Sequence, residues 1–199
     1  MTNKSLTLQD IRDVAKMFNV PPAALYAVRQ VEAPFGGFLK DGRPVILFEA
    51  HRFDALTNGR FRKSHPTLSS ASWDRSLYAR GATPDIRGMR EHDRLEVAGK
   101  LDRDAALKAA SWGAFQILGS NHKQSGFNTL QEFINAMYRD ERAQLIAAMN
   151  FIRNLRIDDE LRRGDWAGFA RVYNGPAYAK NEYDKKLSRA NAQAQPLFR

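Results

Sequence analysis

The chain has 199 residues, 43% of them hydrophobic, which is enough for a sizeable core and excludes an intrinsically disordered protein. It contains no cysteine, which excludes disulfide frameworks, thiol nucleophiles and zinc sites built on cysteine. The formal net charge of +9 is spread over the sequence without a polybasic block, and a diffuse basic surface suits a polyanion such as nucleic acid, an anionic membrane or an acidic cell-wall polymer.

Several further classes lack their sequence signals. No apolar run approaches the ~20 residues that span a bilayer, and residues 1–8 lack the apolar core of a signal peptide. The four histidines are far apart and no glycine-rich phosphate loop is present, so we expect neither a metal nor another cofactor. The sequence predicts a soluble protein without a visible export signal.

Capping signals divide the N-terminal part of the chain into two helices and a strand. Thr7-Leu8-Gln9-Asp10 is typical of a helix N-terminus, with an acidic side chain three residues after the cap. Pro21-Pro22 starts a second helix, which ends near Glu32 because Pro34 prevents its continuation. The apolar run over 45–49 is the best strand candidate.

The remainder of the chain is predicted to be helical after one long irregular segment. Residues 57–90 carry scattered Gly, Pro and Ser and predict a surface excursion, and loops this long are usually functional. Helices are then predicted over about 91–100 and 103–111, after a cap at 128–131, over about 140–156, after the cap Asp165, and over about 179–192. Without an internal repeat, these elements predict one mainly α domain over 1–199.

The most informative residue is Glu32, which closes an apolar helix immediately before a turn. Leu25 and Val28 lie on the same helix, so the carboxyl group is expected at the mouth of a cleft. Burial raises the pKa of a carboxylic acid, and a proton held near neutral pH is what a general acid requires. An ordinary solvated helix end is the alternative interpretation.

Two other segments place polar side chains in unusual surroundings. Gln116 lies between Phe115 and Ile117 in an apolar stretch, where it must find a hydrogen-bond partner. Tyr173-Asn174 precedes Gly175-Pro176, so an aromatic ring and an amide are presented together at a chain reversal. The alternative interpretation of Gln116 is a core amide bonded to backbone, and that of Asn174-Gly175 is a plain helix C-cap.

In this order, Glu32 at a helix end, Ser-x-Gly-x-x-Gln-Ile at 111–117 and Tyr-Asn-Gly at 173–175 resemble the lysozyme superfamily, in particular goose-type lysozymes and lytic transglycosylases. Over about 25–190 the chain looks more closely like the catalytic domain of the N-acetylmuramidase family of phage endolysins. The resemblance implies a mainly α, lysozyme-like fold with at most a small β element and a saccharide cleft between two lobes. One departure is Ala33, where many relatives carry a serine that helps to orient the glutamate.

The resemblance implies that Glu32 protonates the glycosidic oxygen between N-acetylmuramic acid and N-acetylglucosamine in peptidoglycan. Glu49 is the first candidate for a second catalytic carboxylate, because a glutamate in an apolar run is hard to solvate. A structural ion pair of Glu49 with a neighbouring Arg43, Arg52 or His51 is the alternative. The weaker carboxylate candidates are Asp41, Asp54 and Asp85. Without a second carboxylate, attack by the substrate's own 6-hydroxyl would make the enzyme a lytic transglycosylase.

By the same resemblance, four residues line the cleft and bind acetamido or hydroxyl groups: Ser111, Gln116, Tyr173 and Asn174. The expected partner is the peptidoglycan glycan strand, with no nucleic acid, no membrane span and a monomeric state. Synthesis in a bacterial cytoplasm and action in the periplasm fit a phage endolysin, and a secreted interbacterial toxin is the alternative. A non-catalytic basic protein that binds cell wall or nucleic acid is the competing class, although no nucleic-acid-binding motif is present.

Overall fold

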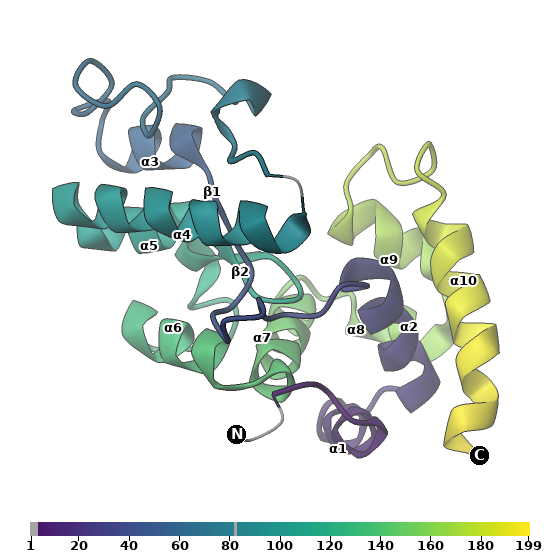
Figure 1. Cartoon of the computed structure of the whole chain (residues 1–199). Coiled ribbons are helices and arrows are strands. Elements are labelled where there is room, and N and C mark those ends of the chain that lie inside the picture. Colours follow the sequence, from purple (N-terminus) through teal and green to yellow (C-terminus); the bar gives the residue numbers. More distant parts are fainter. Residues whose placement is uncertain (1–3, 82) are drawn as a thin grey trace. The chain divides into compact units, whose positions relative to one another are not determined.

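The residues that the computed structural model describes, 4–81 and 83–199, form two compact units (Figure 1). Unit 1 combines the described residues up to Gly37 with Gln124–Gly126 and Asp140–Arg199. Unit 2 combines Phe38–Lys123 with Phe127–Arg139, apart from residue 82. Among the described residues, no helix is both long and apolar enough to cross a membrane. The prediction of a single domain over 1–199 stays a prediction.

The regular elements among the described residues of unit 1 are all helices. Its elements are α1 (Leu8–Phe18), α2 (Pro22–Glu32), α7 (Glu141–Asn154), α8 (Asp158–Arg163), α9 (Trp166–Tyr173), α10 (Tyr183–Ala194) and a terminal 3-10 turn (Gln195–Phe198). Helix α10 packs along α2 and also contacts α9, while α1 packs on α7 (Figure 1). The core is made of fully buried apolar side chains: Leu25, Val28, Leu145, Met149, Ile152, Phe169 and Leu187. Helix α2, which ends at Glu32, is therefore held against α10.

The helix boundaries in unit 1 follow the capping chemistry of the sequence. The Thr7 hydroxyl accepts the Asp10 N–H at 3.1 Å, and the Asp10 carboxylate accepts the Thr7 N–H at 3.0 Å, which confirms the predicted capping box. Asp165 caps α9 by accepting the Gly168 N–H at 2.8 Å. Helix α10 begins at Tyr183 rather than near 179, because the chain from Gly175 to Glu182 forms successive turns.

Unit 2 contains the short sheet and the remaining helices. Its elements are β1 (Ile46–Phe48), α3 (Ala50–Leu56), a 3-10 turn (Arg75–Leu77), α4 (Pro84–Leu101), α5 (Arg103–Ala109), β2 (Ala110–Trp112), β3 (Ile117–Leu118), a 3-10 turn (Gly119–Asn121) and α6 (Leu130–Arg139). The antiparallel order is β1-β2-β3, with Ser111 opposite both Leu47 and Leu118. This register confirms the strand predicted at 45–49 and places Ser111 on the central strand. The architecture is mainly α, with a small sheet, as predicted.

The start of α4 corrects the expectation that residues up to 90 are irregular. The Thr83 hydroxyl accepts the Ile86 N–H at 3.2 Å and Pro84 occupies the first helical position, so the helix begins seven residues before 91. Gly88 lies within this helix, where an added Cβ would come within 2.5 Å of a Leu39 methyl group. That glycine permits close packing rather than marking a loop.

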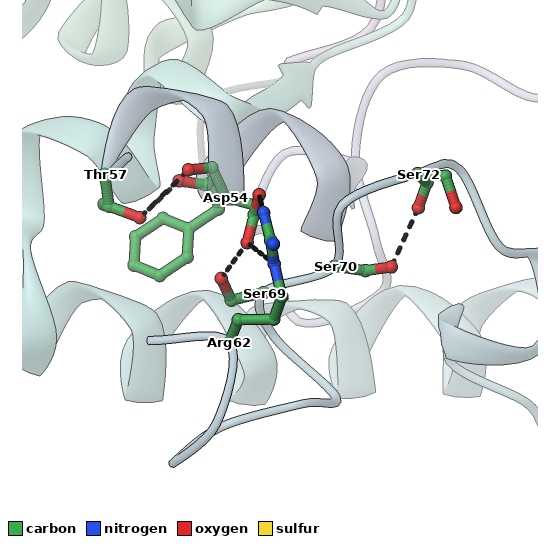
Figure 2. A network of polar contacts seen from close by, with 7 residues as sticks. Asp54, Thr57, Arg62, Ser69, Ser70 and Ser72 are labelled. Atoms are coloured by element: carbon green, nitrogen blue, oxygen red, sulfur yellow. Dashed lines mark hydrogen bonds and ion pairs between the residues drawn. The ribbon is translucent and has the colours of Figure 1, made fainter. Parts of the chain in front are cut away.

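The buried carboxylate of Asp54 on α3 binds side chains from residues 62–69, the segment that follows α3 (Figure 2). Its two oxygens accept the Arg62 Nε and Nη2 donors at 3.0 and 2.6 Å. The Ser69 hydroxyl donates to the same carboxylate at 2.7 Å. The Arg62 guanidinium holds the pKa of Asp54 below its usual range. These contacts give Asp54 a structural task and leave no free oxygen for the catalytic role considered from the sequence.

We expect Asp54→Ala to lower the free energy of unfolding by about 2 kcal/mol, because the buried Ser69 hydroxyl and the Arg62 guanidinium lose their acceptor. Urea unfolding followed by circular dichroism measures this loss. Asp74→Ala is the matched control in the same segment, because Asp74 is exposed and its carboxylate accepts hydrogen bonds from the nearby Ser76, so its loss should cost less than about 1 kcal/mol. Equal losses in the two variants would contradict the structural task of Asp54.

Candidate active site

Glu32 is the last residue of α2, and its half-buried side chain meets the end of α9. The Asn174 side-chain amide donates to Glu32 Oε1 at 3.0 Å. Asn174 is itself fixed at the C-terminus of α9, where its backbone N–H donates to the Ala170 carbonyl at 2.9 Å. Two helix ends that are far apart in the sequence therefore fix the direction of this carboxyl group.

The surroundings of Glu32 favour its protonated form. Burial raises the pKa of the Glu32 carboxyl above its ordinary value, because a desolvated carboxylate loses its hydration. The Asn174 hydrogen bond and the positive charge of Lys186 on α10 lower the pKa and offset part of this increase. The net direction is upward, so Glu32 holds its proton to a higher pH than a solvated glutamate does.

Tyr173 and Asn174, the two residues predicted at the chain reversal, both border Glu32. The Tyr173 ring stacks on Phe169, with ring centroids 5.2 Å apart. Burial raises the pKa of Tyr173 well above its usual value, and the negative charge of Glu32 adds to this increase. The Asn174 Oδ1 atom is buried without a hydrogen-bond partner among the residues that the structure describes. The amide thus acts on Glu32 through its nitrogen alone.

The turn after Glu32 is anchored by a buried residue that the sequence did not single out, Glu141 at the start of α7. Its Oε1 accepts the Gly37 N–H at 2.7 Å and its Oε2 accepts the Leu6 N–H at 3.0 Å. Gly36 has a φ of +78°, and an added Cβ there would lie 2.9 Å from Glu141 Oε1. Glycine is required at position 36 for both reasons. Glu141 therefore fixes the path of the chain that leaves the candidate acid.

Glu49 lies in unit 2, between β1 and α3, with two side-chain partners. The Ser111 hydroxyl donates to Glu49 Oε1 at 3.1 Å, and His51 Nε2 lies 3.5 Å from Glu49 Oε2. The Glu49 backbone N–H donates to the Ala109 carbonyl at 3.1 Å, which extends the contact between β1 and β2. Of the basic partners considered from the sequence, His51 pairs with Glu49, whereas Arg43 pairs with Asp41.

Gln116 lies in the turn between β2 and β3, where its side chain is exposed. The stretch around Gln116 is buried as expected, since Phe115 and Ile117 are both buried, whereas the exposed side chain of Gln116 contradicts the alternative of a core amide. The backbone at Gln116 is left-handed, with φ of +49°. Its Nε2 donates to the Gly113 carbonyl at 2.9 Å, which closes the turn. Glu49, Ser111 and Gln116 thus belong to one small sheet and its turn.

The remaining carboxylates considered from the sequence have structural partners. Asp41 pairs with Arg43 at 2.7 Å, and Asp85 accepts the Lys40 N–H at 2.9 Å. Within 4–81 and 83–199, no three or more histidine, aspartate or glutamate side chains are grouped so that they could hold a metal ion. Among the carboxylates considered from the sequence, Glu32 in unit 1 and Glu49 in unit 2 are the ones whose side chains accept from neither an arginine nor a backbone N–H group of the described chain.

Comparisons with known proteins agree on one family. The family model for N-acetylmuramidase matches residues 21–195. The crystal structure of the Burkholderia AP3 phage endolysin is similar to this chain with a TM-score of 0.87 and 36% sequence identity, covering 98% of this chain and 74% of that chain. A search of curated proteins finds no match.

We expect Glu32→Gln to be more stable than the wild type at pH 7. Because the folded-state pKa of Glu32 is raised, its stability contribution is most favourable below the unfolded pKa of about 4.3 and declines as the pH rises through the folded value. A neutral glutamine avoids this decline and still accepts the Asn174 hydrogen bond. Melting temperatures should differ at pH 7 and converge below pH 4.

Glu96→Gln is the control for this measurement. Glu96 is exposed and its pKa is lowered by Lys100, so its neutralisation should not raise the melting temperature at pH 7. A Glu32→Gln protein that melts at or below the wild-type temperature at pH 7 would contradict the upward direction of the pKa of Glu32.

Proposed function

The chain belongs to the N-acetylmuramidase family, and we propose that it cleaves the β-1,4 bond between N-acetylmuramic acid and N-acetylglucosamine with Glu32 as the general acid. It is a glycoside hydrolase that degrades the peptidoglycan of the bacterial cell wall. The observation that carries the proposal is the half-buried carboxyl of Glu32, which has a raised pKa and is held in a fixed direction by Asn174.

In the proposed reaction, the Glu32 carboxyl donates its proton to the bridging oxygen as the bond from C1 of the muramic acid to that oxygen breaks. Desolvation raises the pKa of Glu32, so the carboxyl keeps its proton to a higher pH than a solvated glutamate does, which suits a general acid. Asn174 supplies an orienting contact that Ala33, the residue after the acid, has no polar side chain to supply. We propose that this contact replaces the one made by the serine of many relatives.

We further propose that Glu49 is the second carboxylate of the reaction. Its two oxygens are engaged by Ser111 and His51, so its direction is fixed. A carboxylate in this role stabilises the positive charge that develops on the sugar and takes the proton of the attacking water, whose oxygen bonds to C1. Ser111 then acts as a positioning residue, while Gln116 and Tyr173 contact the acetamido and hydroxyl groups of the sugars.

The proposed biological setting is that of a phage endolysin, which the 36% identical crystal structure favours over a secreted toxin. The net charge of +9 suits attraction to an anionic cell envelope. We propose that the enzyme acts as a monomer on glycan strands, which size-exclusion chromatography of the active protein tests.

Mass spectrometry of the muropeptides released from purified peptidoglycan tests the reaction. The wild type should release fragments with reducing muramic acid ends. Glu32→Gln and Glu49→Gln should each lower the rate by about 10²–10⁴-fold, the usual contribution of an acid or base group. Asp41→Asn is the control, since Asp41 is paired with Arg43, and it should retain activity.

The outcomes separate the alternatives. Anhydro-muramic ends would identify a lytic transglycosylase and remove Glu49 from the mechanism. Full activity of Glu32→Gln would overturn the assignment of the acid, and absence of products from the wild type would overturn the proposed bond specificity.

The pH dependence of kcat/KM should respond to Lys186 and not to Lys185. A general acid must be protonated, so kcat/KM falls as the pH rises through the pKa of Glu32. Lys186→Gln removes a positive charge that lowers this pKa, and the alkaline limb should move to higher pH. Lys185→Gln removes the same charge from the same helix, but Lys185 pairs with Glu182, so its profile should match the wild type. Equal shifts in both variants would indicate a general charge effect instead.

A further inference from the structure

A cavity of about 1100 Å³ lies within unit 2, beside the sheet that carries Glu49. Its walls come from the chain at Val45–Leu47, the segment between Trp73 and Gly81, and the first turns of α4. Gln116 from the β2–β3 turn also lines it. Its volume exceeds that of pockets for ordinary drug-sized ligands, so a ligand of several linked groups fits it.

Two aromatic rings stand on one wall of this cavity. Trp73 is 59% exposed although it is a large apolar side chain, and its ring centroid lies 6.1 Å from that of Tyr78. Burial raises the pKa of Tyr78, and the negative charge of Glu49 raises it further, so Tyr78 lies within electrostatic reach of the proposed second carboxylate. The exposed face of the Trp73 ring suits the apolar C–H face of a sugar ring.

The same cavity carries an excess of positive charge from Arg75, Arg80 and Arg87. Its acidic lining residue, Glu91, is already neutralised, because it pairs with Arg94 at 2.7 Å and accepts the Phe48 N–H at 3.0 Å. Within the part of the chain that the structure describes, the side chains of Arg75 and Arg80 make no hydrogen bond or ion pair. Their guanidinium donors remain available for an anionic ligand.

We propose that this cavity binds the peptide stem of the peptidoglycan substrate, with Arg75, Arg80 and Arg87 recognising stem carboxylates and Trp73 contacting the adjoining sugar. The inference rests on the proposed function, because it concerns the substrate of the same site. The muramic acid of peptidoglycan carries a short peptide with free carboxylates, whereas an unmodified chitin-like chain carries none. Guanidinium groups match carboxylates through paired N–H donors, which makes arginine the suitable cation here.

Arg87 has a structural contact, since its Nη1 donates to the Gly81 carbonyl at 3.0 Å. The discriminating variant is therefore Arg75→Gln/Arg80→Gln, which removes two charges without removing a described side-chain contact. Lys63→Gln/Lys123→Gln is the matched control, because both lysines are exposed in unit 2 and neither lines the cavity. It removes the same charge from the same unit.

Calorimetric titration with three soluble ligands tests the inference on the full chain. The ligands are the disaccharide N-acetylglucosaminyl-N-acetylmuramic acid with its tetrapeptide, the same disaccharide with a free lactyl carboxylate, and chitotetraose. The disaccharide ligands lack the bond that the enzyme is proposed to cleave, so their binding is measured independently of activity. The tetrapeptide ligand should bind most tightly to the wild type. The double arginine variant should bind it about 10- to 100-fold more weakly, and the double lysine variant should match the wild type.

Three results would overturn the inference. Equal weakening by the arginine and lysine variants would indicate diffuse charge, and an unchanged affinity in the arginine variant would exclude the cavity. Equal arginine dependence for the peptide-free disaccharide would assign the site to the lactyl carboxylate instead of the stem. The proposed cleavage fails separately, when wild-type protein releases no muropeptides from intact peptidoglycan.

Discussion

A carboxyl group that is taken out of water must either receive hydrogen-bond donors or keep its proton. Glu91 and Glu141 take the first course, since each accepts two backbone N–H groups and so joins distant parts of its own unit. Glu32 takes the second, because a single amide from Asn174 does not offset its burial. The same residue type thus serves as a structural anchor or as an acid, according to the number of donors that the fold provides.

The charged side chains of unit 2 also fall into two groups, those that are paired within the fold and those that remain free to bind a ligand. Several acidic side chains of unit 2 pair with an arginine: Asp41 with Arg43, Asp54 with Arg62 and Glu91 with Arg94. Glu49 instead has the His51 ring 3.5 Å away. The arginines that line the cavity outnumber its acidic residues, so part of the net charge of +9 is concentrated around the cavity. Positive charge spread over the whole surface attracts an anionic polymer from a distance, whereas positive charge concentrated at one cavity favours binding of particular anionic groups attached to that polymer.

Local chemistry made much of the fold predictable, because caps act within four residues. The Thr7 box, the start of α2 at Pro22 and the Asp165 cap all follow this rule. The start of α4 at Pro84 was missed because glycine and proline within 81–88 suggested a loop, whereas Gly88 serves helix packing.

The same rule limits what the sequence reveals of the candidate site. Glu32 could be singled out from its own helix and turn, but its contact with Asn174 spans 142 residues. No sequence pattern indicates the role of Glu141, because its partners are backbone N–H groups, which nearly every residue carries. Its position has an engineering consequence: residue 4 accepts the Glu141 N–H and residue 6 donates to its carboxylate, while Gly37 shares that carboxylate. A cargo domain fused before residue 4 would therefore pull on the turn beside the acid.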